Sequence, residues 1–367
     1  MTFAAIIVLW TVTGVLVVAT ALPFTKVSHG SIQGLAFPRE QFLGVALVAM
    51  LAFWYFQPDN WGIGLIAMGV VALIQAIFII KFTPVWPRQS VEADRELLAR
   101  KEAQISVLAA NVKQSNRDYP RLIGLIKERQ PDVVMAIETD AKWIDALKSG
   151  LTDEYEAWVE VPKDNGYGLC LMSRLALSET EVRELITKDV PSIRTTLSLR
   201  DGRKIRLYVV HPEPPVIDHD TIGRDSEIAM VGLEATKDDL PCVVSGDLND
   251  VAWSTTTRRF QRLSRLLDPR VGRGFYNTFS ATMPWMRWPL DHLFHDAQFR
   301  LIEMARERKI GSDHFPMWFS LVLADTASIN SDPGDAEVGE VVQAKREIIA
   351  ERRRDREPIG SDWEDEN

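Results

Sequence analysis

An acid and an amide two positions apart, Asp247 and Asn249, are the residues around which the sequence is best interpreted. They follow Gly246 and the apolar run 241–244. In an extended chain, side chains two positions apart project to the same face, so the two groups aim at one point. An aspartate at such a place most often stabilises a turn. The pair therefore needs support from elsewhere in the chain before it predicts chemistry.

A second acid lies beside an imidazole further along. Asp313 and His314 directly precede the apolar run 317–323, and Gly311 precedes them by two positions. A histidine at a strand end can move a proton at neutral pH, and a neighbouring carboxylate can fix its orientation. Two such strand ends in one chain indicate a catalytic or metal-binding site.

Five sequence blocks, taken in order, extend this pattern and resemble the signature blocks of the endonuclease/exonuclease/phosphatase superfamily, in its membrane-tethered bacterial type (YafD/VanJ-like). The resemblance spans roughly residues 105–323. It implies a four-layer α/β sandwich, in which two packed mixed β-sheets are flanked by helices, and phosphoester hydrolysis. The blocks are Ala110-Asn111-Val112, Met135-Ala136-Ile137-Glu138-Thr139, Gly246-Asp247-Leu248-Asn249, Leu290-Asp291-His292-Leu293-Phe294 and Gly311-Ser312-Asp313-His314-Phe315-Pro316.

The resemblance implies a bound cation, because phosphoester hydrolysis develops negative charge that a divalent metal neutralises. Glu138 would be the principal ligand of Mg²⁺, with Mn²⁺ as an alternative, since hard cations take carboxylate oxygens. Asn111 would help to orient the metal or a phosphoryl oxygen. Asp313 would reach the metal side of the site.

The resemblance also assigns the proton and hydrogen-bond chemistry. Asp247 would position or deprotonate the attacking water, and Asn249 would donate to the phosphoryl oxygens. His314 would be fixed in orientation by Asp291. His211, at the end of an expected strand, would stabilise charge on the phosphoryl group.

Three residues between the Asp247 and Asp291 blocks, Arg273, Trp285 and Arg287, are candidate substrate-binding residues. They could line a basic, aromatic groove for nucleic acid or a pocket that opens toward a bilayer. The substrate is therefore a lipid-linked phosphoester, a small diester or a nucleic acid. A membrane-anchored phosphoesterase is favoured; an endonuclease or exonuclease and a catalytically silent membrane scaffold are the alternatives. No obligate protein partner is inferred.

Composition limits these options. The 367-residue chain has a net charge of −9, which argues against binding nucleic acid by bulk attraction. Its two cysteines, Cys170 and Cys242, lie in apolar runs. They cannot form a disulfide scaffold or a four-cysteine zinc site, and we expect them in the core.

Three apolar segments at the start of the chain predict membrane-spanning helices at residues 3–22, 42–56 and 61–82. The first and third match the roughly 20 residues that a bilayer requires. The second is short and would need its flanks or local thinning of the bilayer. We therefore expect a multi-pass membrane domain at residues 1–83.

Orientation follows from the positive charges beside these segments. Lys26 and Arg39 lie in the first loop, and Lys81, Arg88 and Arg95 follow the third segment. The positive-inside rule then places the catalytic domain in the cytoplasm. The outer face stays open, because the VanJ-type proteins that the chain resembles act there.

The remaining chain divides into three parts. Residues 84–103 are expected to form a linker with a short charged helix at 91–101. Residues 104–324 alternate strand and helix patterns and are expected to form the catalytic domain. The polar stretch 325–367 is expected to be a disordered charged tail.

Overall fold

Two β-sheets pack face to face in a computed structural model that describes residues 2–25 and 27–361. One sheet has the strand order β10-β11-β1-β2-β4-β3 and the other β5-β6-β7-β8-β9. Each combines one parallel pair with antiparallel pairs. The strands are β1 (Gln104–Asn111), β2 (Val133–Ile137), β3 (Ala157–Val161), β4 (Leu169–Ser173), β5 (Leu177–Glu184), β6 (Pro191–Ser198), β7 (Lys204–Val210), β8 (Cys242–Asp247), β9 (Asp291–His295), β10 (Phe299–Arg306) and β11 (Met317–Leu323).

Strand β1 illustrates why the sheets stack. Ile105, Val107 and Ala109 point into the core between the two sheets. Leu108 and Ala110, on the other face, pack under helices. A strand that is apolar on both faces is buried on both, so it belongs in the middle of a layered fold.

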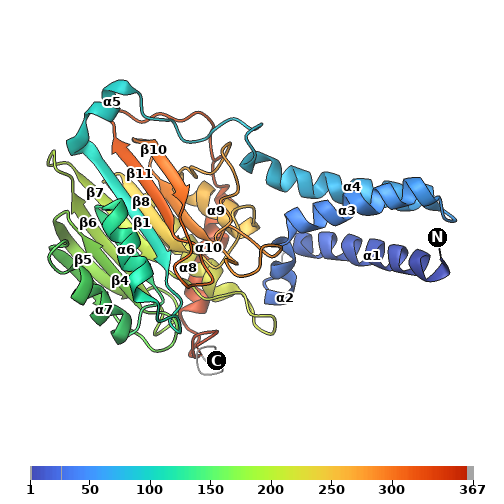
Figure 1. Cartoon of the computed structure of the whole chain (residues 1–367), viewed down its shortest axis with the longest axis horizontal. Helices are drawn as coiled ribbons and strands as arrows, with labels where there is room; N and C mark the ends of the chain where they lie inside the picture. Colours follow the sequence, from blue (N-terminus) through green and yellow to red (C-terminus); the bar gives the residue numbers. More distant parts are fainter. Residues whose placement is uncertain (1, 26, 362–367) are drawn as a thin grey trace.

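Helices cover the outer face of each sheet and complete the predicted four-layer α/β sandwich (Figure 1). Two pack on the sheet that contains β1, and three lie on the side of the sheet that contains β8. They are α6 (Tyr119–Arg129) and α7 (Ala141–Leu151), then α8 (Ile222–Ala235), α9 (Thr255–Ser264) and α10 (Val338–Glu351).

The N-terminal segments form a helical arm that projects away from the sandwich (Figure 1). Two helices, Phe3–Thr25 and Trp61–Phe82, are long and apolar enough to cross a membrane. The third predicted span is a pair, Gly30–Ala36 and Arg39–Phe56, bent by 66°. Two or three helices of the arm could therefore span a bilayer. The arm consists of α1 (Phe3–Ala21), η1 (Leu22–Thr25), α2 (Gly30–Gln33), η2 (Gly34–Ala36), α3 (Arg39–Phe56), α4 (Trp61–Ile79) and η3 (Ile80–Phe82).

The base of the arm is packed against the sandwich. Trp253 donates its indole N–H to the carbonyl of Ala36 at 2.7 Å and is fully buried. Gly30 donates its amide to the carbonyl of His219 at 2.8 Å. A Cβ at Gly30 would lie 1.8 Å from the Val216 carbonyl oxygen, so only glycine permits this approach.

The predicted linker is bound to the sandwich along its length. Ser90 Oγ lies 2.6 Å from His295 Nε2, and Leu301 donates its amide to the Val91 carbonyl at 2.9 Å. This pairing with β10 holds Val91 extended, so the helix expected at 91–101 is confined to α5 (Arg95–Ala99), followed by η4 (Lys101–Ala103).

The prediction of a disordered tail is wrong for the described residues that form α10. Val341, Ala344 and Ile348 form an apolar stripe at helical spacing, and the Ala344 side chain is fully buried against α8 and α9. Glu340 and Glu347 form ion pairs with arginines of α9. The many charged residues around this stripe made it hard to recognise in the sequence. Burial of its apolar side chains offsets the conformational entropy lost when the helix is ordered.

Candidate active site

Six of the predicted side chains converge where strands of the two sheets end. Asn111 Nδ2 donates to Asp247 Oδ2 at 3.0 Å, which joins the end of β1 in one sheet to the end of β8 in the other. The other four follow β2, follow β7, open β9 and precede β11. They are Glu138, His211, Asp291 and His314.

Two backbone features create this convergence. A Cβ at Gly246 would lie 1.9 Å from the Val210 carbonyl oxygen, so glycine lets β8 approach β7 and brings Asp247 beside His211. Glu138 has a left-handed backbone, with φ of 64°. Such strain in a non-glycine residue is typical of functional positions.

The first cluster consists of Glu138, His211 and Asp247, whose ligand atoms lie within 4.8 Å of one another. Asn111 Nδ2 donates to Glu138 Oε1 at 2.6 Å as well as to Asp247. His211 Nε2 lies 3.9 Å from Glu138 Oε1. Two carboxylates, an imidazole and an amide thus face one point.

The second cluster shares Asp247 and adds Asp291 and His314. His314 Nδ1 lies 2.8 Å from Asp291 Oδ2, and its Nε2 lies 3.6 Å from Asp247 Oδ2. Asp291 is positioned in turn because its amide donates to Thr278 Oγ1 at 3.2 Å. The predicted pairing of His314 with Asp291, and not with its neighbour Asp313, is present.

Burial and charge set the protonation of the site. Burial, together with the charge of Asp313, raises the pKa of Glu138 to about 8. Burial lowers the pKa of His211 to about 4. Burial also disfavours the protonated form of His314. The negative charges of Asp291 and Asp247 have the larger effect and raise the pKa of His314 to about 10. The site therefore combines a neutral imidazole with a cationic one.

These residues fit a divalent cation. Glu138 is a half-buried carboxylate with no Lys or Arg within ion-pair distance among the described residues, and His211 Nδ1 is buried without a hydrogen-bond partner. A hard cation held by Glu138 and Asp247 oxygens would stabilise both carboxylates in their charged form. The structure does not distinguish Mg²⁺ from Mn²⁺.

Two predicted residues have other contacts. Asp313 Oδ2 lies 3.2 Å from Lys113 Nζ, and Asp313 belongs to neither cluster of possible ligands. Asn249 Nδ2 donates to the Pro212 carbonyl at 2.9 Å, although Asn249 still lines the catalytic pocket.

The three predicted substrate-binding residues are brought together, but in a separate cavity. Arg273, Trp285 and Arg287 line a cavity of about 1030 Å³. The catalytic pocket, of about 70 Å³, shares no lining residue with it.

The sequence interpretation missed several residues of the site. Tyr167 packs its ring 5.4 Å from that of His211, and Phe279 lies 5.0 Å from His314. Gly360, near the end of the described chain, also lines the catalytic pocket. The sequence offers one signal for Tyr167, namely the Asn165-Gly166 turn directly before it. A glycine near a site lets the backbone approach other groups closely.

The chain belongs to the Endonuclease/Exonuclease/phosphatase family, whose model matches residues 108–314. The matched segment contains all six converging side chains. No curated protein matches the chain.

The chain is similar to several solved structures, and the two with a TM-score of 0.50 share its fold. D. rerio TDP2 humanized by 14 mutations is 18% identical, with a TM-score of 0.50 over 60% of this chain and 99% of that one. D. rerio TDP2 complexed with a single-strand DNA product is 19% identical, with the same TM-score and coverage. A Bacteroides thetaiotaomicron mannosyl-6-phosphatase is 18% identical, with a TM-score of 0.48 over 60% of this chain and 100% of that one.

Proposed function

We propose that the protein is a membrane-anchored, divalent-metal-dependent phosphoesterase, of the YafD/VanJ-like type, that hydrolyses a phosphodiester or a phosphomonoester or diphosphate. The observation that carries the proposal is the meeting of Asn111, Glu138, His211, Asp247, Asp291 and His314 at the strand ends. This set contains ligands for a hard cation, a base for water and donors for phosphoryl oxygens.

The geometry supports the following proposed roles. Glu138 and Asp247 would hold the cation, which would neutralise charge at the phosphoryl group. Asp247, within 3.6 Å of the His314 imidazole, accepts a proton as water attacks phosphorus and the ester P–O bond breaks. His211, neutral because it is buried, donates a hydrogen bond to the phosphoryl oxygens. Asp291 keeps His314 oriented and cationic, which stabilises the same charge.

Membrane anchoring is supported by how the catalytic loops contact the arm. The loop after Asp247 reaches Trp253, which is hydrogen-bonded to Ala36. The loop after His211 reaches His219, which is hydrogen-bonded to Gly30. Both loops therefore link the site to the arm, which favours a lipid-linked or small phosphoester over nucleic acid as the substrate. The charge bias of the sequence favours a cytoplasmic catalytic domain.

The test is a hydrolysis panel with the full-length protein in Mg²⁺ and in EDTA. The substrates are single-stranded DNA, RNA, a polyprenyl diphosphate and a phosphodiester lipid, and Asp247→Ala serves as the blank. We expect Mg²⁺-dependent release of product from a lipid substrate and none from the blank. Hydrolysis of DNA or RNA alone would assign the site to a nuclease, and no hydrolysis of any substrate would favour a silent scaffold.

A further inference from the structure

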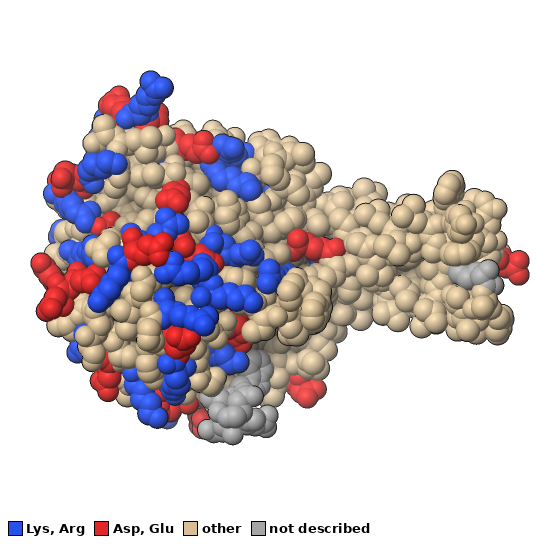
Figure 2. All heavy atoms as spheres, in the orientation of Figure 1, with Lys and Arg blue, Asp and Glu red and all other residues tan. Residues whose placement is uncertain are grey.

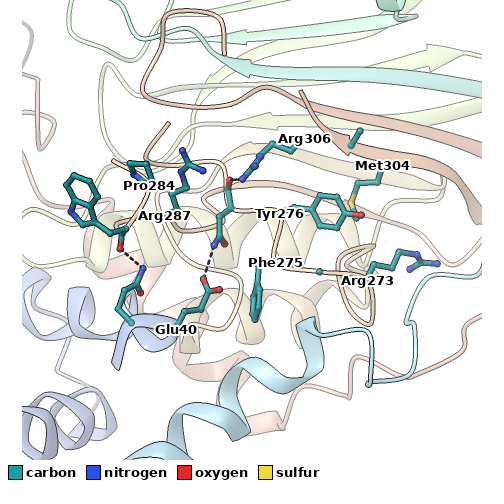
Figure 3. Close-up of a pocket in the computed structure, with 13 residues that line it drawn as sticks. Glu40, Arg273, Phe275, Tyr276, Pro284, Arg287, Met304 and Arg306 are labelled. Atoms are coloured by element: carbon teal, nitrogen blue, oxygen red, sulfur yellow. Dashed lines mark hydrogen bonds between the residues drawn. The ribbon is translucent and has the colours of Figure 1, made fainter. Parts of the chain in front are cut away.

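A cavity of about 1030 Å³ lies at the base of the helical arm, outside the catalytic pocket. It is formed between the first turn of α3 and the catalytic domain, and we call it the arm-base pocket (Figure 3). Asn277 Nδ2 donates to Glu40 Oε2 at 2.8 Å, and Gln41 Nε2 donates to the Trp285 carbonyl at 3.1 Å. These bonds join the arm to the domain at the edge of the pocket.

Two arginines of the pocket have no acidic partner. Arg287 and Arg306 lie together on the side of the pocket away from Glu40 (Figure 3). Among the described residues, neither has a carboxylate within ion-pair distance. Arg287 donates a hydrogen bond to the carbonyl of Ser280, and Arg306 donates one to the carbonyl of Asn277. Both guanidiniums lie over the Phe315 ring, at 5.1 and 4.5 Å.

The cations of this cluster lie close to one another. Burial and the nearby charge of Arg287 lower the pKa of Arg306. Lys309 adds a third cation near the same ring, 5.9 Å from its centroid. Arg273 differs, because it is held by the Ser90 and Pro269 carbonyls and lies near Glu92. Arg287 and Arg306 are thus the pair available to an anion such as a phosphate group.

The mouth of the pocket is apolar and faces the arm. Trp285, in the loop that contacts α3, is 70% exposed, and Met283 and Met286 beside it are 39% exposed. Further along α3, Val45 and Val48 are exposed apolar residues. Figure 2 shows Lys and Arg side chains close to the base of an arm whose own surface is almost free of charge. Cations next to an exposed tryptophan and an apolar helix are typical of a membrane interface.

We propose that the arm-base pocket binds the phosphate of an anionic membrane phospholipid, with Arg287 and Arg306 as the groups that contact it and the acyl chains lying along α3. The bound lipid would fix the catalytic domain at the bilayer surface. A net charge of −9 for the chain disfavours a polyanionic nucleic acid at the same place.

The experiment measures lipid binding and needs no catalytic turnover. Full-length protein in detergent is titrated with phosphatidylglycerol or phosphatidylcholine, and bound lipid is counted by native mass spectrometry. We expect phosphatidylglycerol to be retained in preference. The double variant Arg287→Gln/Arg306→Gln should weaken its binding at least about tenfold, because two charge-assisted contacts are lost. Arg308→Gln, which removes one nearby charge paired with Glu128, should change nothing.

A second variant keeps both arginines and fills the pocket. Ala305→Phe should also weaken phosphatidylglycerol binding, and it stands in for the double variant if that protein does not fold. Glycerol 3-phosphate at millimolar concentration should not displace the lipid. Three results would overturn the proposal: equal retention of both lipids, displacement by free glycerol 3-phosphate, or displacement by a single-stranded oligonucleotide. Because hydrolysis is not measured, failure of the proposed function would leave this result unaffected.

Discussion

The catalytic pocket and the arm-base pocket carry opposite charge and share one property. In the first, Glu138 is a half-buried acid with no Lys or Arg within ion-pair distance among the described residues. In the second, Arg287 is half-buried and Arg306 is exposed, and neither has a carboxylate within ion-pair distance among the described residues. A partly desolvated charge without a counter-charge gains from an ion of the opposite sign, so each pocket is suited to a ligand of the missing sign. The comparison predicts a metal ion in one pocket and a phosphate in the other.

A third region shows what a compensated cluster looks like. Glu213 and Glu351 are each 2% exposed at the side chain, and Arg356 pairs with both, at 2.6 and 2.8 Å. Here the chain supplies its own cation, so no ligand is required. Glu138 differs because its side chain is 20% exposed and because no arginine among the described residues lies within ion-pair distance of it.

The largest effect on the rate of hydrolysis is expected from replacing Asp247, which belongs to both clusters of the site. Asp247→Ala should lower the rate of Mg²⁺-dependent phosphoester hydrolysis by roughly 10²–10³, because a group that acts on the transition state is lost. Steady-state kinetics with the panel substrate measures this. The exposed Asp145→Ala is the matched control and should retain full activity. A variant Asp247→Ala that keeps most of the rate would disprove the assigned role.

The second largest effect, on stability, is expected from replacing Arg356, which pairs with Glu213 and Glu351. Arg356→Ala leaves the buried carboxylate of Glu213 without a cationic partner among the described residues, while Glu351 keeps its ion pair with Arg354. The variant should destabilise the fold by about 2–3 kcal/mol, below the roughly 3–5 kcal/mol of a fully buried pair, because Arg356 keeps some exposure. A thermal melt should show Tm lower by roughly 5–10 °C. Arg353→Ala, at an exposed position, should leave Tm unchanged. The same Tm for both variants would show that Arg356 does not stabilise the buried carboxylates.

A smaller effect is expected when one metal ligand loses its charge. Glu138→Gln keeps the shape of the side chain and should raise the Mg²⁺ concentration needed for half-maximal activity by about tenfold, since a carboxylate binds Mg²⁺ better than an amide. A Mg²⁺ titration of the hydrolysis rate measures this. An unchanged requirement would place the cation elsewhere.

The smallest predicted effect depends on pH. Burial and the nearby Glu213 raise the pKa of Glu227 to about 8, above its ordinary value near 4.5. Stability from this group is therefore complete below pH 4.5 and is lost as the pH rises through 8. Glu227→Gln should raise Tm relative to the parent by roughly 5 °C at pH 9 and by much less at pH 5.

The control is Glu156→Gln at an exposed position, which should shift Tm equally little at both pH values. A parent protein whose Tm does not fall relative to Glu227→Gln between pH 5 and pH 9 would show that Glu227 is charged in the folded state without penalty.

Much of the site could be predicted because its residues follow strands that have clear apolar patterns. Asn111 and Asp247 each end a run of buried residues, so their positions at a sheet edge follow from the sequence. Contacts between segments that are far apart in the sequence could not be predicted in this way. The ion pair of Asp313 with Lys113 and the hydrogen bond of Asn249 to Pro212 depend on how loops from different strands meet.

Two strands at sheet edges, β3 and β5, have weak strand patterns in the sequence. β3 and β5 each have a single neighbouring strand, and most of their residues are partly or fully exposed. β5 carries charges along its length, as in Arg183 and Glu184. Charged side chains protect an edge strand against pairing with another chain, and they also remove the apolar alternation by which strands are recognised.

Binding of Mn²⁺ to the full-length protein, followed by electron paramagnetic resonance, tests most directly whether the strand ends form one metal site. The account predicts a bound-Mn²⁺ signal that is lost in Glu138→Gln/Asp247→Asn and retained in Asp313→Asn, whose carboxylate is paired with Lys113. The same signal in the parent and the double variant, or no bound Mn²⁺ in the parent, would contradict it.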